Sequence, residues 1–170
     1  MTDTCQNCGT EYEKIAQHWS TSENCEYPPL SDHQQEIITG LLMGDGTIGR
    51  DRKNPRILST MISPNYLKYV DCELGVFGHG VSLKTTAEEN AKKKRDTGFN
   101  PDAQAENYSD VYKWRSRSHP EFEEFVNWYS SGKKVWAEDI ELTPTVLKHW
   151  YCGDGNWNNS GSCNRIRIAM

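Results

Sequence analysis

The triplet Gly-Asp-Gly occurs twice in this chain, at residues 44–46 and 153–155, and each copy follows a mainly apolar run with helical spacing. The apolar residues are Ile37, Ile38, Leu41 and Leu42 in the first run, and Val146, Leu147, Trp150 and Tyr151 in the second. An aspartate at the carboxyl end of a helix meets the negative end of the helix dipole, which is locally unfavourable. The repetition therefore predicts two helices that deliver two carboxylates, Asp45 and Asp154, to a shared place. The simpler alternative is that both triplets only stop their helices.

Glycines on these two runs predict that the helices pack side by side. Gly40 and Gly44 lie one turn apart on the first helix, and Gly153 ends the second, so the two backbones can approach closely. Adjacent carboxylates repel each other unless cations bind between them, and Mg²⁺ prefers oxygen ligands. A site that holds Mg²⁺ (or Mn²⁺) between Asp45 and Asp154 suits phosphodiester hydrolysis, in which metal ions stabilise the attacking and leaving oxygens.

These segments resemble the two motifs of the LAGLIDADG homing endonucleases, in the branch that carries both motifs on one chain. Ile38-Thr-Gly-Leu-Leu-Met-Gly-Asp-Gly46 corresponds to the first motif and Leu147-Lys-His-Trp-Tyr-Cys-Gly-Asp-Gly155 to the second. The resemblance covers about residues 31–168. It implies an α+β fold of two αββαββα halves around the motif helices. It also implies a site-specific endonuclease that cuts both strands of DNA with Mg²⁺ held by Asp45 and Asp154.

The second repeat looks incomplete beside the first. By the resemblance, residues 30–140 form the first half, whereas residues 141–170 provide only the second motif helix and a partial hairpin. The chain is then a fragment, an enzyme completed by a second chain, or a degenerate relic. Intron homing by a freestanding or intron-encoded enzyme fits Met1 and the absence of a splice-type ending better than an intein does. By the resemblance, His149 stands where the family has an interface glycine in the second helix, with bulky Trp150 beside it, which would loosen or reshape the helix contact.

The family also keeps a basic residue near each active site, where it polarises the scissile phosphate. Lys133 and Lys134 follow the third amphipathic segment, and either of them fits this role by resemblance. An ordinary pair of surface lysines is the alternative.

Basic side chains are placed where a DNA-binding sheet would need them. Residues 111–117 alternate, so that one face of the strand is basic and the other is largely aromatic. A basic sheet face suits the major groove, although a solvated strand face is the alternative. The resemblance assigns base reading to the hairpin at residues 47–62. The candidate DNA-binding residues are Arg50, Arg52, Lys53, Arg56, Lys113, Arg115 and Arg117.

Residues 1–29 are expected to form a separate zinc-binding module and linker. Its Cys and His residues follow the spacing C-x2-C-x9-H-x6-C, and four such ligands match the tetrahedral preference of Zn²⁺. A segment this short cannot bury a core, so a metal ion would stabilise it. A lone redox CxxC is the alternative. The predicted ligands are Cys5, Cys8, His18 and Cys25.

Charge and hydropathy limit the partners. Residues 1–49 carry one basic and eight acidic side chains, whereas residues 50–170 carry 18 basic and 16 acidic ones, so the main body is the part suited to double-stranded DNA. No apolar stretch approaches the roughly 20 residues of a membrane span, and no signal peptide opens the chain. We therefore expect a cytoplasmic protein without a membrane partner. A non-catalytic nucleic-acid-binding protein, such as an RNA-splicing maturase, is the competing hypothesis.

Four helices and three strands are expected in the main body. The helices begin after Ser31 and at Ser63-Pro64, His119-Pro120 and Thr143-Pro144, because these residues are typical of helix starts. The strands cover residues 56–62, 81–85 and 111–117.

Several smaller features complete the prediction. Residues 87–110 lack periodicity and are expected to form a surface loop, which contains the basic run 92–95. Gly46 is expected to end the first helix in a left-handed conformation. Cys72 and Cys163 are expected to be buried thiols, and His79 and His119 to have structural roles.

Overall fold

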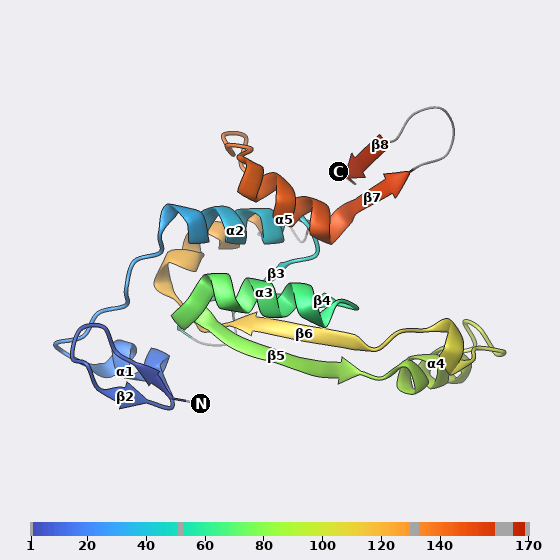
Figure 1. Cartoon of the computed structure of the whole chain (residues 1–170), viewed down its shortest axis with the longest axis horizontal. Coiled ribbons are helices and arrows are strands. Elements are labelled where there is room, and N and C mark those ends of the chain that lie inside the picture. Colours follow the sequence, from blue (N-terminus) through green and yellow to red (C-terminus); the bar gives the residue numbers. More distant parts are fainter. Residues whose placement is uncertain (1, 51–52, 130–132, 159–164, 169–170) are drawn as a thin grey trace.

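A four-stranded antiparallel sheet in the order β3-β4-β6-β5 organises the chain (Figure 1). The computed structural model describes residues 2–50, 53–129, 133–158 and 165–168. The strands are β3 (Thr47–Gly49), β4 (Arg56–Met61), β5 (Gly78–Thr85) and β6 (Val111–Ser116). In the register of β4 and β6, Leu58 lies opposite Arg115 and Thr60 lies opposite Lys113. These four side chains therefore share one face, whereas Trp114 is buried on the other.

The helices α2 (Asp32–Met43), α3 (Pro64–Leu74) and α5 (Pro144–Asp154) lie on the same side of β5 and β6 in Figure 1. The 3-10 helix η3 (Pro120–Tyr129) also joins the core beneath them. The core combines Ile37, Leu41 and Leu42 of α2 with Trp114 of β6 and Phe122 of η3. One face of the sheet is thus covered, and the other remains available to a partner.

Side-chain caps start these helices where the sequence predicts them. The Ser31 hydroxyl accepts a hydrogen bond from the Gln34 amide, and the Gln34 side chain accepts one from the Ser31 amide, which completes a capping box. The Ser63 hydroxyl caps α3, and the Thr143 hydroxyl caps α5 by accepting from the Val146 amide. Each cap satisfies amide groups that the first turn leaves unpaired.

The second repeat begins as expected. Helix α5 lies alongside α2 and leads directly into β7 (Gly155–Asn158), which pairs antiparallel with β8 (Arg165–Ile168). The α+β class is therefore confirmed, and α5, β7 and β8 follow in the order expected for the start of a second half.

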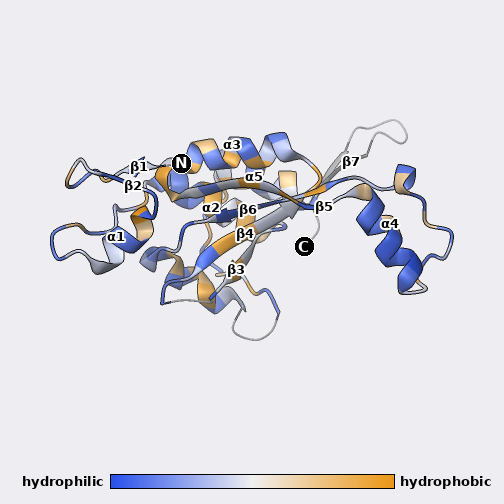
Figure 2. Ribbon diagram, turned by 90° about the horizontal axis from the view of Figure 1, so that it is seen from below, coloured by the Kyte–Doolittle hydropathy of each residue, from blue (hydrophilic) through white to orange (hydrophobic). Residues whose placement is uncertain are grey.

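The expected loop at residues 87–110 is wrong. Ala87–Asp96 forms helix α4, and η2 (Ala105–Asn107) follows it. Thr86 and Glu89 make a reciprocal capping box, and the basic residues of the last turn complement the helix dipole. Apolar periodicity could not show this helix, because Ala91 is its only buried residue and Figure 2 shows it as largely hydrophilic.

Three finer expectations also need correction. The segment after His119 is a 3-10 helix (Pro120–Tyr129) rather than an α-helix. Gly46 has no positive φ, and it is a glycine because an added Cβ would collide with the backbone of Leu41. Cys72 is exposed, and Cys163 lies outside the described residues.

The N-terminal module contains β1 (Asp3–Thr4), β2 (Glu11–Tyr12) and α1 (Ile15–Thr21), and it lies at the opposite end of β5 and β6 from α4 (Figure 1). A separate small core forms around Ile15 and Trp19. The expected linker is packed against the main body, because Tyr27 contacts the buried His119 edge to face and His119 Nε2 lies 3.0 Å from the Pro28 carbonyl oxygen. This bond gives His119 the structural role that we expected. Residues 2–29 therefore pack against the main body.

Candidate active site between the motif helices

Glycines let α2 and α5 approach at backbone distance, as the sequence predicts. A Cβ added to Gly40 would lie 2.5 Å from the Val146 carbonyl oxygen and 2.7 Å from His149 Cβ. A Cβ added to Gly153 would lie 2.7 Å from the Asp45 amide nitrogen and 3.0 Å from Gly44 Cα. Because side chains cannot fit at these points, the glycines set the spacing of the two helices.

His149 packs directly beside this contact. Its side chain is fully buried, and its Nδ1 lies 2.7 Å from the Tyr66 hydroxyl of α3. The residue therefore connects α5 to α3 while its Cβ faces Gly40. Burial, with a smaller contribution from the Lys148 charge, lowers the pKa of His149 to about 4, so the ring is neutral at pH 7.

The structure brings Asp45 and Asp154 together at the ends of the paired helices. Asp154 is the last residue of α5 and is half-buried, whereas Asp45 follows α2 and is exposed. Burial raises the pKa of the Asp154 carboxyl, and the neighbouring Asp45 carboxylate raises it further. Both causes disfavour the charged form of Asp154, and a bound cation would favour it.

Lys134 faces this pair. The Lys134 ammonium donates a hydrogen bond to the Gly44 carbonyl, directly before Asp45, whereas Lys133 is exposed. Burial lowers the pKa of Lys134, and the charges of Asp154 and Asp45 oppose that shift. The ammonium thus lies within the electrostatic reach of both carboxylates.

Sequence reasoning missed Tyr129. Its hydroxyl donates a hydrogen bond of 3.0 Å to the Gly46 carbonyl oxygen, directly after Asp45. Burial raises the pKa of Tyr129 to about 12, which keeps the hydroxyl protonated as a donor. Tyr129 and Lys134 therefore hold the two carbonyls on either side of Asp45. The only sequence signal was the position of Tyr129 at the end of the third amphipathic segment.

Two carboxylates at one point fit a hard divalent cation. Carboxylate oxygens are the ligands that Mg²⁺ and Mn²⁺ accept, and Asp45 and Asp154 lie close enough for each carboxyl group to affect the other. Both Asp45 and Asp154 would hold the ion.

Most of the basic residues predicted to bind DNA lie on or beside the uncovered face of the sheet. Lys113 and Arg115 are exposed there, and Lys53 is exposed in the turn before β4. Arg56 is half-buried in β4, and exposed Arg50 forms an ion pair with Glu123. Arg52 lies outside the described residues.

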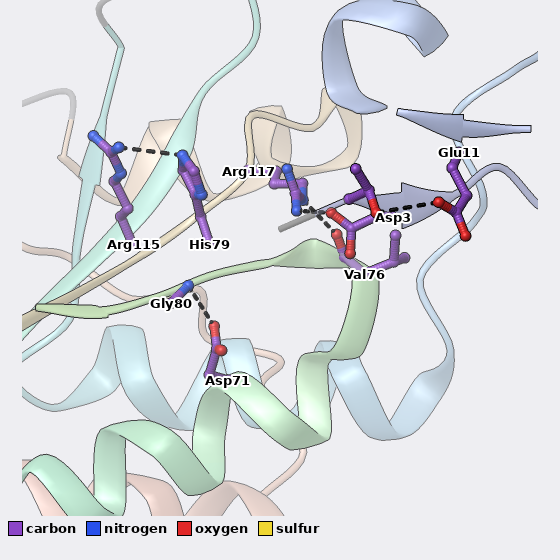
Figure 3. Close-up of polar contacts among 9 residues, drawn as sticks. Asp3, Glu11, Asp71, Val76, His79, Gly80, Arg115 and Arg117 are labelled. Atoms are coloured by element: carbon purple, nitrogen blue, oxygen red, sulfur yellow. Dashed lines mark hydrogen bonds and ion pairs between the residues drawn. The ribbon is translucent and has the colours of Figure 1, made fainter. Parts of the chain in front are cut away.

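Arg117 does not fit the DNA-binding prediction. Its guanidinium forms an ion pair with Asp3 of the N-terminal module, and its Nε donates a hydrogen bond of 2.9 Å to the Val76 carbonyl (Figure 3). Only 10% of the Arg117 side chain is exposed. The strand alternation placed this residue on the correct face, but the module covers it.

Comparison with known proteins decides the family. Residues 35–170 match the model of the LAGLIDADG DNA endonuclease family. The chain belongs to the LAGLIDADG family. The fold agrees, because the homing endonuclease I-WcaI bound to its DNA recognition sequence superposes with a TM-score of 0.64 at 15% identity, over 91% of this chain and 63% of that one.

Curated relatives of this LAGLIDADG chain are bacterial RecA proteins. Protein RecA of Mycobacterium shimoidei is 28% identical over 159 residues, which cover 83% of this chain and 32% of that protein. Protein RecA of Mycobacterium leprae is 26% identical over 157 residues, with coverage of 83% and 19%. The chain therefore spans at most about a third of the curated relatives it matches. Within the described LAGLIDADG fold, no helix has both the length and the apolar character needed to cross a bilayer.

The N-terminal module precedes the residues that match the LAGLIDADG model, and its cysteines and histidine converge. The ligand atoms of Cys5, Cys8, His18 and Cys25 all lie within 4.8 Å of one another, and Cys8 Sγ is 3.7 Å from His18 Nε2. Tetrahedral Zn²⁺ with Zn–S of about 2.3 Å and Zn–N of about 2.0 Å requires ligand separations of roughly 3.5–3.8 Å. The donor set and its spacing therefore fit a zinc knuckle.

Proposed function

We propose that this chain is a site-specific DNA endonuclease in which Asp45 and Asp154 hold a divalent metal ion. The observation that carries this proposal is the meeting of both motif aspartates at the carboxyl ends of α2 and α5. An aspartate pair at this position destabilises the helix ends, and the two carboxylates repel each other. Metal binding would offset both costs.

The chain's own residues define how a phosphodiester would be attacked. A bound Mg²⁺ supplies Lewis acidity and lowers the pKa of a coordinated water. The close backbone contact of Gly44 with Gly153 places Asp45 and Asp154 side by side, so that both carboxylates can bind the same ion. Lys134 carries a positive charge beside them and is suited to a non-bridging phosphate oxygen, because that oxygen gains charge as the bond breaks.

The uncovered sheet face is proposed to bind double-stranded DNA. Lys113 and Arg115 lie opposite Thr60 and Leu58, so cations and neutral side chains share this surface. Arg and Lys can neutralise phosphates, and Arg can also pair with guanine in the major groove. Lys53, Arg50 and Arg56 extend the same surface along the β3–β4 hairpin.

Nicking of a supercoiled plasmid library with randomised inserts, in Mg²⁺ or Mn²⁺, tests the catalytic assignment without a known target, because a site-specific enzyme cuts the members that carry its site. Asp45→Asn and Asp154→Asn should abolish nicking but retain binding to a duplex measured by fluorescence anisotropy. Asp139→Asn, an exposed acid outside the site, is the matched control. Binding without nicking by the unaltered protein would instead support a non-catalytic nucleic-acid-binding protein, such as a maturase.

Lys134→Met and Lys133→Met form a matched pair for the basic residue. The first should lower the nicking rate at unchanged metal affinity, because it removes a charge that stabilises the transition state. The second should retain the rate. Equal losses would remove Lys134 from the proposed site.

We further propose that a second sheet beside α5 is required for cleavage of both strands. Exposed Leu142, Leu147 and Val135 lie on and before α5, where such a sheet and its helices would pack. A second chain or further residues would supply it. This protein alone is then expected to convert supercoiled plasmid to the nicked form, and direct linearisation would contradict the requirement.

The N-terminal cluster is proposed to hold a structural Zn²⁺. Metal analysis of the purified protein should give one zinc per chain, and Cys8→Ala should lose it. Because the module has only a small core, chelation should make residues 1–29 sensitive to protease while the main body resists. Cys72→Ala, which removes an exposed thiol elsewhere, should keep the zinc.

A further inference from the structure

The N-terminal module occupies one end of the basic sheet face. Lys113, Arg115 and Arg117 occupy every second position and share that face. Arg117, however, is directed to Asp3 of β1 and to the Val76 carbonyl (Figure 3). Val76 also packs against the module core. The module is therefore anchored through the residue that would otherwise continue the DNA-binding surface.

Arg115 shows the opposite arrangement one step along the same strand. It is exposed, and its Nη2 lies 3.2 Å from His79 Nε2 (Figure 3). Burial and the Arg115 charge lower the pKa of His79, so the contact is with a neutral ring. Arg115 thus keeps a positive charge that is open to a phosphate, whereas a carboxylate compensates the charge of Arg117.

The module itself has the wrong charge for DNA. Residues 1–29 carry five acidic side chains and one lysine. A hollow of about 760 Å³ lies between the module and the sheet, lined by Asp3, Glu13 and Lys14 of the module and by His79, Arg115 and Arg117 of the main body. Phosphates that approach this end of the sheet meet carboxylates, so the module opposes further DNA contact rather than adding to it.

We infer that the acidic zinc module limits DNA binding at one end of the sheet face, and that the ion pair with Asp3 keeps Arg117 from contacting DNA. The module lowers the non-specific affinity for DNA and marks the end of the surface that the duplex can contact. This inference rests on the proposed binding of DNA. It makes Asp3 and Arg117 specificity-determining residues, and it gives the module a role beyond its own stability.

Asp3→Ala is the first test, with a mixed-sequence 30-bp duplex as the probe. Release of Arg117 adds about one phosphate contact, which steepens the slope of log K against log salt by about 0.9. The duplex should bind more tightly, and this gain should shrink by about 3.5-fold between 50 and 200 mM salt. Unchanged or weaker binding by Asp3→Ala would overturn the inference.

Three variants separate the contact from general charge. Glu23→Ala removes an exposed acid of the same module and should give a smaller gain. Asp3→Ala combined with Arg117→Gln should lose the gain, because the released cation is absent. Arg115→Gln should weaken binding even in the unaltered background. Equal gains from Glu23→Ala and Asp3→Ala would show that net charge alone is responsible, which overturns the role of Arg117.

Chemical labelling tests the contact without DNA. Phenylglyoxal followed by mass spectrometry should modify Arg115 faster than Arg117 in the unaltered protein, and Asp3→Ala should remove the protection of Arg117. Zinc content and a thermal melt confirm that the variant keeps its module. Labelling as expected without any duplex binding would refute the proposed DNA binding. Labelling as expected with unaltered duplex binding in Asp3→Ala would refute only the proposal that the module limits DNA binding.

Discussion

The hydroxyl of Tyr129 donates a 3.0 Å hydrogen bond to the carbonyl oxygen of Gly46, directly after Asp45. Lys134, from the same stretch of chain, donates to the carbonyl of Gly44, directly before it. The turn that carries Asp45 is thus held on both sides by a segment that follows the sheet. This arrangement makes the position of one proposed metal ligand depend on the packing of η3.

Tyr129→Phe should lower plasmid nicking while DNA binding is retained, because the turn at Asp45 loses one of its two supports. The free energy of unfolding should fall by about 1 kcal/mol, the usual contribution of one buried hydrogen bond. Urea unfolding and a nicking assay measure the two effects. Tyr108→Phe, directly after η2, should leave nicking unchanged. An equal loss in that variant would argue against a specific role for Tyr129.

Asp154→Asn should stabilise the metal-free protein. The folded-state pKa of Asp154 is raised, so ionisation of this group costs stability above the pKa of the unfolded chain. Because the side chain is partly exposed, the gain at pH 7.5 should stay below about 1 kcal/mol. Mg²⁺ should stabilise the unaltered protein and have less effect on the variant. A metal-free variant that is less stable than the unaltered protein would contradict the repulsion between Asp45 and Asp154.

Gly40→Ala should separate the motif helices. The new Cβ would collide with Val146 and His149, and overpacking of this kind costs about 1–3 kcal/mol. Nicking should fall more than duplex binding, since the contact between α2 and α5 positions both aspartates whereas the sheet is proposed to bind the duplex. Thr39→Ala, on the same helix, makes a comparable change in size without the collision, and it should be close to neutral in a thermal melt.

Stability should decrease in mild acid because of His149. The folded pKa of about 4 lies below the unfolded value of about 6.5, so the unfolded chain takes up the proton first. The contribution of the neutral ring is therefore complete above pH 6.5 and is lost as the pH falls towards 4, by at most about 1.4 kcal/mol per pH unit. His149→Gln should flatten this slope in urea titrations. His79→Gln removes a more exposed histidine, and a comparable flattening by that variant would contradict the assignment to His149.

Much of the fold follows from local sequence. Ser31 with Gln34, Ser63 with Pro64, and Thr143 with Pro144 start helices because each hydroxyl caps amides within its own first turn. Strand alternation in residues 111–116 buries Trp114 and exposes Arg115. Helix α4 was not predicted from local sequence, because nearly all of its surface is exposed and its capping box is the only strong local signal.

The candidate sites divide in the same way. The spacing of Cys5, Cys8, His18 and Cys25 was sufficient to predict their convergence, since the residues lie within one short segment. The glycines at the seam and the repeated Gly-Asp-Gly triplet likewise pointed to Asp45 and Asp154. Motif resemblance added the family, and the match over residues 35–170 bears it out.

The sequence by itself determined the capped helices α2, α3 and α5, the strand that buries Trp114, the cysteine and histidine cluster, and the pair of aspartates. Only the tertiary structure decided that Lys134 lies near that pair, that Tyr129 supports the turn at Asp45, and that Arg117 forms an ion pair with Asp3. Capping and alternation act between residues a few positions apart, where backbone geometry fixes the distance. The other contacts join residues far apart in the chain, and their distances depend on how whole elements pack.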